Sequence, residues 1–411
     1  MDDKMALIPI EQQQLVNRVS QQIALTDRLL SLYNDDLPEL IPYRKGDKWG
    51  FCDIRKRIVI DCIYEDVSRF NEGKAAIEKN QKWGFIDKNG IEIITCIYET
   101  FSWSLVLDEI PIFPMFSEGL LGAFRNQKWG FIDVNGIEII PCELEVDCSF
   151  SQFSEGLAKI SDGKYPFKWG FIDKNGQIVL PCYYQSVSNF TGGLVIVCKN
   201  LNKYKEVDKF GFLDKNFNQV IPPKGSNQAS FSYAPTPFRD GISLIRDGVL
   251  NYYFLDNKGN YLIDAHYYKA FPFSEGLAPI KQRSDEWKFI NKDGEIVVDG
   301  IYKYELLNGF SEGLAPITHY YKSGIGFIDK SGIVVIPINI NYTPSPNCFV
   351  EGFAKVQREG KWGFIDKKGI EIIECCYQEV ENFYQGLALV EKNEKKGYID
   401  KRGVEYWEVH Y

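Results

Sequence analysis

The chain has 411 residues, of which 45% are hydrophobic and 15% aromatic, so it can build one or more hydrophobic cores and is not expected to be disordered. Its net charge of −9 has the same sign as nucleic acid and anionic lipid, so electrostatic attraction to either is not expected. No run of about 18 apolar residues occurs, and the N-terminus lacks the pattern of a signal peptide, so we expect a cytoplasmic protein that does not engage a membrane.

The first 37 residues differ from the rest of the chain, and we predict that they form a separate N-terminal helix or cap. Leu15, Val19, Ile23 and Leu30 recur at helical spacing within residues 8–34, and "NDDLP" follows as a stop signal. The end of a repeat array needs an unlike cover, so we interpret this helix as a cap on the first repeat. The alternative is that it binds a partner or a second copy of the chain.

Residues 38–411 contain one sequence unit that is written about ten times. Clear copies are "QKWGFIDKNGIEII" at 81–94, "QKWGFIDVNGIEII" at 127–140 and "GKWGFIDKKGIEII" at 360–373. The residue after the Trp position recurs at intervals of 34 to 46 residues: Gly50, Gly84, Gly130, Gly170, Gly211, Tyr253, Lys288, Gly326, Gly363 and Gly397. Recurrence at this period is typical of tandem repeat architectures.

The Trp-Gly-Phe core of the unit reads as a strand. Trp83 and Phe85 are two residues apart, so in a strand they share a face and suit packing against a neighbouring unit. A glycine inside a strand implies that another group approaches closely, and we expect an aromatic ring from the next unit. We assign a structural role to the motif residues Trp49, Gly50, Trp83, Gly84, Asp87, Gly90, Trp129, Gly130, Trp169, Gly170, Trp362 and Gly363.

Turn signals separate the strands of each unit. In "DKNG", Asp87 can close an Asx-turn by accepting a backbone N–H, and Gly90 can take a positive φ. A strand such as "IEIIPC", a tyrosine region and "FSEGLA" follow, so each unit is predicted to be a three-stranded meander with a segment that adds a fourth strand. Five cysteines stand at similar points and are predicted to be small buried residues: Cys62, Cys96, Cys142, Cys182 and Cys376.

The sequence contains no pattern that predicts a catalytic or metal-binding site. Equivalent turn aspartates would have similar pKa values, which does not suit an acid–base pair. No C-x-x-C pair, complete calcium loop or phosphate-binding glycine motif occurs, and His266, His319 and His410 lie far apart in sequence. Lysines interleaved with rings in "QKWGFIDK" resemble a single-strand stacking platform, but the acidic balance argues against it. We therefore expect no cofactor.

The pattern "GKWGFID", "IIP" and "FSEG" in one register resembles the tryptophan–glycine (WG) repeat family of bacterial proteins, over roughly nine-tenths of the chain. The resemblance implies a binding or regulatory module, often found in stress and conflict systems, whose repeat carries no catalytic residues. Units five to eight depart from the pattern, with Phe210-Gly211, Tyr252-Tyr253, Trp287-Lys288 and Ile325-Gly326 in place of Trp-Gly.

The predicted fold is an all-β tandem repeat of about ten three-to-four-stranded antiparallel meanders. Closed propellers usually have four to eight blades, so ten units favour an open curved solenoid. The alternative is a β-propeller-like arrangement with one or two rings.

The predicted function is that of a non-enzymatic protein-binding scaffold or regulatory or inhibitory partner. A small-ligand or glycan sensor with exposed aromatic residues is the alternative, and a hydrolytic enzyme is a distant third. The spacing of 46 from Gly84 to Gly130 indicates an apolar insertion within "ETFSWSLVLDEIPIFPMFSEG". Either this insertion folds back over the array, or it docks a partner protein through Phe101, Trp103, Asp108, Ile112 and Phe113.

Overall fold

The computed structural model describes residues 37–99, 116–148, 152–199, 209–224, 236–239, 241–247, 251–258, 260–262, 267–282, 286–301, 304–319, 324–343 and 345–408. The helix predicted within residues 8–34 lies outside these ranges, as does the insertion at 100–115. Every element assigned in the described part is a β-strand.

The strands form ten small sheets, which we number in chain order. Sheet 1 contains β1 (Ile41–Lys45), β2 (Lys48–Cys52) and β3 (Ile58–Tyr64), and sheet 2 contains β4 (Asp66–Val67), β5 (Lys74–Lys79), β6 (Lys82–Asp87) and β7 (Glu92–Glu99). Sheet 3 contains β8 (Leu120–Arg125), β9 (Lys128–Asp133) and β10 (Glu138–Leu144), and sheet 4 contains β11 (Leu157–Ser161), β12 (Trp169–Asp173) and β13 (Ile178–Tyr184). Sheet 5 contains β14 (Ser186–Val187), β15 (Leu194–Lys199), β16 (Lys209–Asp214) and β17 (Gln219–Lys224).

The second half of the chain continues the series. Its sheets are sheet 6, β18 (Ile242–Asp247) and β19 (Asn251–Asp256); sheet 7, β20 (Lys269–Ala270), β21 (Ala278–Lys281), β22 (Trp287–Ile290) and β23 (Ile296–Ile301); sheet 8, β24 (Tyr304–Leu306), β25 (Leu314–His319), β26 (Ile325–Asp329) and β27 (Val334–Asn339); sheet 9, β28 (Phe353–Arg358), β29 (Lys361–Asp366) and β30 (Glu371–Tyr377); and sheet 10, β31 (Glu379–Val380), β32 (Leu387–Lys392) and β33 (Lys395–Asp400).

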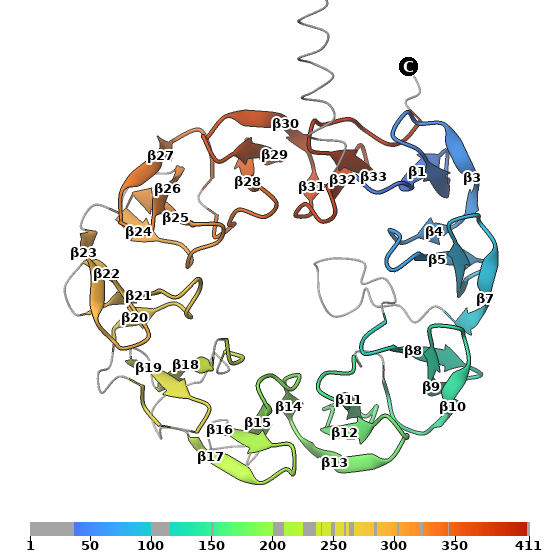
Figure 1. Cartoon of the computed structure of the whole chain (residues 1–411), viewed down its shortest axis with the longest axis horizontal. Coiled ribbons are helices and arrows are strands. Elements are labelled where there is room, and N and C mark those ends of the chain that lie inside the picture. The colour runs from blue at the N-terminus through green and yellow to red at the C-terminus, as the bar shows by residue number, and fades with distance from the viewer. Residues whose placement is uncertain are drawn as a thin grey trace, which may run out of the picture.

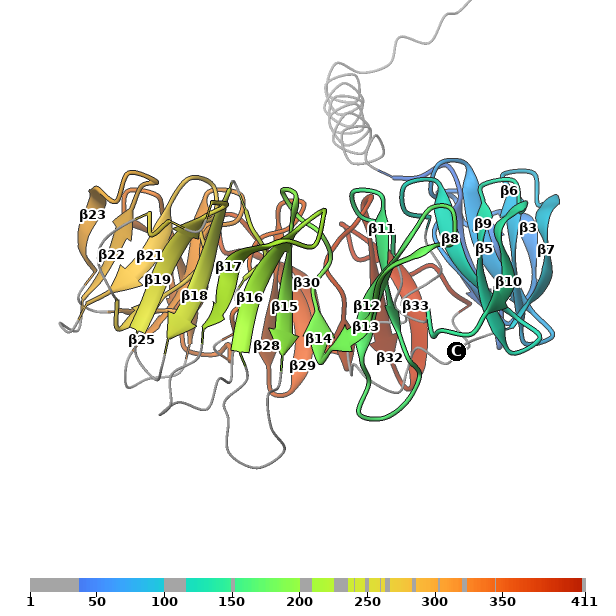
Figure 2. The same cartoon turned by 90° about the horizontal axis from the view of Figure 1, so that it is seen from below.

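Within each sheet the strands follow one another as an antiparallel meander, which confirms the predicted unit. The sheets stand side by side around a common centre, and the last strand of a sheet, such as β7, β13 or β30, lies on the perimeter (Figure 1). Seen from the side, the strands run between the two faces of this ring (Figure 2).

The ring is closed, so the expectation of an open solenoid is wrong and the ring-shaped alternative holds. The backbone N–H of Arg44 in β1 donates to the Tyr406 carbonyl, and the Glu408 N–H donates back to the Arg44 carbonyl. The Trp49 and Tyr398 rings meet at 6.0 Å, with their planes at 76°. Sheets 1 and 10 therefore share a core, and ten sheets complete a circle because each junction turns the chain by a small angle.

The hydrophobic core is divided into layers between neighbouring sheets. The buried apolar residues of the described ranges form nine clusters, each drawing on consecutive sheets. One of them joins Leu387 and Tyr398 of sheet 10 to Trp49 and Phe51 of sheet 1 and Ala75 of sheet 2. The Trp–Phe stripe of the motif thus packs between sheets, as the sequence predicts.

The motif requires a glycine because the outer strand of the sheet bulges over this position. In sheet 2, Trp83 pairs with Tyr98 and Phe85 with Ile94, so residues 95–97 lie opposite Gly84 alone. In sheet 3, a Cβ on Gly130 would lie 2.5 Å from the Ile140 carbonyl oxygen, which is closer than atoms can pack. The group that approaches is therefore the backbone of the same unit, and the predicted ring from the next unit is wrong here.

The turns follow their sequence signals closely. Asp87 accepts the N–H groups of Asn89 at 2.9 Å and Ile91 at 2.8 Å, and Gly90 has a φ of +78°. The same pair of bonds recurs at the other nine copies of this position, which are Asp53, Asp133, Asp173, Asp214, Asp256, Asn291, Asp329, Asp366 and Asp400. The repeated aspartate is a turn residue.

The cysteines occupy the bulges. The Cys142 thiol donates to the Ala123 carbonyl at 3.6 Å, and Cys375, rather than the predicted Cys376, makes the matching contact to Val356 at 3.7 Å. They are half-buried rather than fully buried. Burial raises the pKa of Cys96 and of Cys182 to about 11, so these thiols are protonated at neutral pH.

A glutamate on the inner side links each of several sheets to the next. Glu118 precedes β8 with a φ of +51°, a conformation that a glutamate adopts at a cost. Its carboxylate accepts the Gly156 N–H of sheet 4 at 3.0 Å and pairs with Lys174 of the same sheet at 3.0 Å. Glu155, Glu275, Glu312 and Glu351 make the corresponding contacts at later junctions.

A tyrosine links the sheets on the outer side. The Tyr342 hydroxyl donates to Glu371 of sheet 9 at 2.6 Å, and the Arg358 guanidinium holds the same carboxylate at 2.8 and 2.9 Å. Tyr377 repeats the contact with Glu405 at 3.2 Å. These links explain why glutamate recurs in the unit, and they give the hydroxyl of the buried tyrosine a partner in the next sheet.

Two glycines of sheet 3 test whether the motif glycine is required by the bulged outer strand or whether any glycine of the sheet is equally sensitive to replacement. We expect Gly130→Ala to lower the free energy of unfolding by about 3 kcal/mol, because its Cβ would overlap the bulged backbone. Gly122→Ala is the matched control, since its Cβ would meet atoms at 3.7 Å and beyond, which is ordinary contact. Urea denaturation measures both changes, and equal effects would contradict the bulge explanation.

Candidate functional site

The junction between sheets 2 and 3 differs from the other junctions. Val134 stands where Lys174 and its equivalents pair with the glutamate of the preceding sheet, and the corresponding glutamate, Glu72, is exposed. The insertion at 100–115 also begins here, directly after Glu99. The inner link made by Glu118, Glu155, Glu275, Glu312 and Glu351 is therefore missing here, as it is where Gly192 and Gln385 stand at the glutamate position, and the insertion sets this junction apart.

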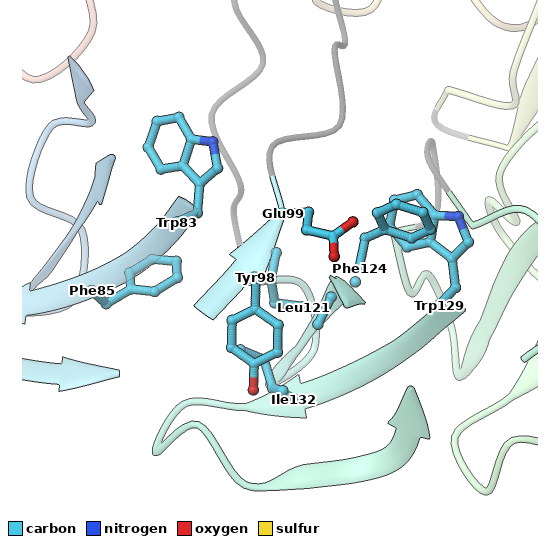
Figure 3. Close-up of a pocket in the computed structure, with 10 residues that line it drawn as sticks. Trp83, Phe85, Tyr98, Glu99, Leu121, Phe124, Trp129 and Ile132 are labelled. Atoms are coloured by element: carbon cyan, nitrogen blue, oxygen red, sulfur yellow. The ribbon is translucent and has the colours of Figure 1, made fainter. Parts of the chain in front are cut away.

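A cleft of about 440 Å³, which includes space open to solvent, lies at this junction (Figure 3). Sheet 2 contributes side chains from β6 and β7, and sheet 3 contributes β8 and β9. The lining residues are Trp83, Phe85, Tyr98, Glu99, Leu121, Gly122, Ala123, Phe124, Trp129 and Ile132.

The cleft has a buried floor and partly exposed walls. Tyr98 and Trp129 are 7% and 5% exposed, so they belong to the core between the two sheets. Trp83 and Phe124 are half-buried and face the opening from opposite sheets. The Phe124 ring packs on Trp129 with ring centres 4.9 Å apart, which fixes this wall.

Gly122 keeps the cleft open on the side of sheet 3. It pairs with Phe131, and the same position holds Ala76 in sheet 2 and Lys159 in sheet 4. Its backbone does not need glycine for conformational reasons, because φ is not positive and a Cβ would fit. The missing side chain therefore leaves volume in the cleft rather than relieving strain.

Glu99 is the one acidic side chain of the cleft. Its equivalents Glu65 and Glu145 pair with a lysine of their own sheet, Lys48 at 2.7 Å in sheet 1 and Lys128 in sheet 3. Glu99 instead accepts the Asn126 N–H of the neighbouring sheet at 3.0 Å. Figure 3 shows its carboxylate between Trp83 on one side and Phe124 and Trp129 on the other.

Two cations stand near the cleft, Arg125 and Lys82. Arg125 pairs with Glu138 within sheet 3, and the same carboxylate raises the pKa of Tyr98 in addition to the larger effect of burial. Lys82 lies opposite Glu99 in the strand register and is exposed. In the described part of the chain, no three His, Cys, Asp or Glu side chains gather as a metal site would require.

The sequence pointed to this junction but not to these residues. Phe101, Trp103, Asp108, Ile112 and Phe113, the predicted partner-binding residues, lie outside the described residues. Trp83, Glu99 and Phe124 were not predicted as a site, since the Trp was assigned to the core and the other two carry no motif. The departure of Val134 and Gly122 from the repeat is the signal that marks them.

The motif residues otherwise occupy structural positions. Of the six tryptophans at the motif position, Trp49, Trp129 and Trp287 are buried, and Trp83, Trp169 and Trp362 are half-buried. No helix in the described ranges has the length and apolar content of a membrane span.

Comparison with solved structures finds proteins of similar fold at low sequence identity. A crystal structure of a eukaryotic initiation factor matches with a TM-score of 0.50 at 10% identity, over 82% of this chain and 95% of that chain. Others are BamB from Moraxella catarrhalis (TM-score 0.40, 10% identity, 70% of this chain and 95% of that chain) and the β-propeller domain of the Trilobed protease from Pyrococcus furiosus (0.36, 13%, 64% and 97%). At these identities the likeness concerns the fold alone. No curated protein matches the chain.

The chain is thus an all-β repeat protein whose small antiparallel sheets form a propeller-like ring. The family model for the WG containing repeat matches eight times, at residues 49–83, 83–102, 129–165, 169–204, 254–284, 289–322, 325–362 and 362–395, which is more than half of the sequence. The chain belongs to the WG-containing repeat family, as the sequence motif predicts.

Replacing the two tryptophans of the cleft tests which of their rings contributes more to the stability of the fold. We expect Trp129→Ala to cost about 3–5 kcal/mol of stability because it removes a buried ring. Trp83→Ala should cost less than half as much, since part of that ring is already in contact with solvent. Thermal and urea unfolding of both variants checks the difference. A larger loss for Trp83→Ala would place that ring in the core rather than in the wall.

Proposed function

We propose that this protein is a non-enzymatic scaffold that binds another protein, as a regulatory or inhibitory partner in a bacterial stress or conflict system. The observation that carries the proposal is the cleft between sheets 2 and 3. It is an aromatic, partly exposed surface at a junction that lacks the inner link and at which an apolar insertion begins. Large rings in such settings dominate the energetics of protein interfaces.

The chemistry of the repeat supports binding rather than catalysis. The repeated aspartates each accept two backbone N–H groups in a turn, and those bonds hold the pKa of Asp53 and of Asp87 below the ordinary value. Such carboxylates are ionised at neutral pH and are poor proton donors. The half-buried cysteines have raised pKa values, which disfavours the thiolate that a nucleophile needs.

A sensor with one aromatic platform per repeat is less well supported. Such a sensor would expose the same ring in many units, whereas half of the six motif tryptophans are buried and none is fully exposed. The most exposed rings of the described residues, Tyr165, Tyr183 and Tyr384, stand at three different positions of the unit and not at one repeated position.

The proposal is tested by capture from a lysate of the source cells. The full chain is immobilised beside the cleft variants Gly122→Leu and Trp83→Ala and the control Glu145→Gln, and retained proteins are compared by quantitative mass spectrometry. We expect a protein that wild type and Glu145→Gln retain and that both cleft variants lose. Identical profiles for all four proteins, with each variant shown to be folded by its melting curve, would contradict the proposal.

A further inference from the structure

The junction where the ring closes, between sheets 10 and 1, has polar contacts of its own, and we call it the seam. Gln385 stands where other sheets carry the linking glutamate, and Ile54 stands where the linking lysine would be. Two backbone hydrogen bonds join the C-terminal residues Tyr406 and Glu408 to Arg44 of β1. The inner side of the seam is therefore held by groups other than the repeated link.

Arg69 of sheet 2 reaches past sheet 1 and binds the inner loop of sheet 10. Its guanidinium donates to the carbonyl oxygens of Tyr384 at 2.8 Å and Leu387 at 2.9 Å, and it lies 5.3 Å from the centre of the Tyr398 ring. The inner strands β4 and β31, which precede these two loops, lie on the inner side of the ring on either side of sheet 1 (Figure 1). At the same repeat position the other described sheets carry uncharged residues: Gln152, Asn189, Pro237, Pro272, Gly309, Cys348 and Asn382.

Two half-buried carboxylates flank this contact, one from each neighbour of sheet 1. Asp66 begins β4 in sheet 2, and Glu381 follows β31 in sheet 10 and lies 3.6 Å from the Arg69 guanidinium. The charged groups that act on Asp66 are Glu78 of β5, Lys396 of β33 and Arg44 of β1, and those that act on Glu381 are Arg69, Lys396 and Lys355 of β28. Because Lys396 acts on both carboxylates, Asp66 and Glu381 belong to one cluster that spans the seam.

The cluster makes closure of the seam depend on pH. Burial raises the pKa of Asp66 to about 6 and also raises the pKa of Glu381, and in both cases it outweighs the nearby cations. Opening the seam gives the carboxylates back to water, where their pKa values return toward 3.8 and 4.5. The closed seam thus binds protons that the open seam releases, so its stability is greatest in acid and falls as the pH rises through about 6.

The other groups of the fold do not share this behaviour. Burial raises the pKa of the Tyr398 hydroxyl, which lies among the charged groups, so it stays uncharged at neutral pH. The pKa values of the turn residue Asp87 and of the linking residue Glu118 are lowered, so their stabilising contribution is lost only in stronger acid. A change between about pH 5 and about pH 7.5 is therefore specific to the seam.

We propose that the seam is a pH-responsive latch, in which Arg69 binds sheet 10 to sheet 2 and ionisation of Asp66 and Glu381 weakens the closure of the ring. The Arg69 contact does not require an ionised Glu381, because two of its hydrogen bonds end on backbone carbonyls. Acid therefore tightens the ring, and neutral pH loosens it at this junction. The inference is independent of the cleft and goes beyond the proposed function.

The latch is tested by amide hydrogen exchange of the full chain, read by mass spectrometry at about pH 5 and about pH 7.5 and expressed as protection factors. This expression removes the change of the intrinsic exchange rate with pH. We expect residues 41–45 and 395–408 to be roughly tenfold less protected at the higher pH, since one pKa unit corresponds to about a tenfold change. Residues 353–366 of sheet 9 serve as the reference segment and should change less.

Matched variants separate the two parts of the latch. Asp66→Asn should keep the seam protected at about pH 7.5 and remove most of the pH difference, whereas Asp147→Asn, the same repeat position in sheet 4, should leave the difference unchanged. Arg69→Met should lower protection of the seam roughly tenfold at both pH values, and Gln152→Met is its control.

Three results would overturn the inference: equal protection of the seam at both pH values, a pH difference that survives Asp66→Asn, or a seam that Arg69→Met leaves unchanged. The Asp66 carboxylate accepts the N–H of the adjacent Val67, which an amide oxygen can also accept. The Asp66→Asn variant therefore tests the latch even if Arg69→Met does not fold.

Discussion

The close passage of a bulged outer strand over the motif glycine is the constraint on which the rest of the structure depends. Three residues of β7 lie opposite Gly84, and the same surplus recurs in sheet 9 opposite Gly363. In sheets 2 and 9 the chain comes back into register at the following tyrosine, Tyr98 or Tyr377, and Tyr377 then donates to Glu405 at the next sheet. A side chain on the glycine would push the outer strand away and break this link, so one small residue controls both the sheet and its junction.

Because the junctions are built alike, the chain closes into a ring, and a junction that departs from the common pattern is where we propose a function. Tryptophan, phenylalanine, glutamate and tyrosine are repeated because each is used between sheets, with buried layers on the inside and polar links on both edges. We therefore assign a stabilising role to residues that recur in most units, and we look for the candidate site where residues depart from the repeat. Between sheets 2 and 3, Val134, Gly122 and the reoriented Glu99 depart together.

Much of the fold follows from local sequence, and the rest depends on distances that a sequence does not express. The strands and turns are predictable because Asp87 and Gly90 act within four residues of one another. The sequence predicts that some group lies close to Gly84, but it does not predict that this group is the outer strand, since nothing in "IEIITC" indicates a bulge. Closure was not predictable, because the angle between sheets is set by packing such as that of Trp49 on Tyr398, 349 residues apart. The cleft was missed because Trp83 carries the same motif as the core tryptophan Trp129.

Closure of the ring is tested most directly by a distance between its first and last sheets. Spin labels are placed through an unnatural amino acid, since the chain has ten cysteines, on the exposed hairpin residues Asp47 and Glu394 of sheets 1 and 10. The pair Glu359 and Glu394, on the hairpins of the consecutive sheets 9 and 10, supplies the reference distance. Pulsed electron–electron double resonance should give one narrow distance distribution for the pair Asp47 and Glu394, with a mean similar to that of the pair Glu359 and Glu394. A distance several times longer, or a broad distribution beside a narrow reference, would show that sheets 1 and 10 are not neighbours and would contradict the closed ring.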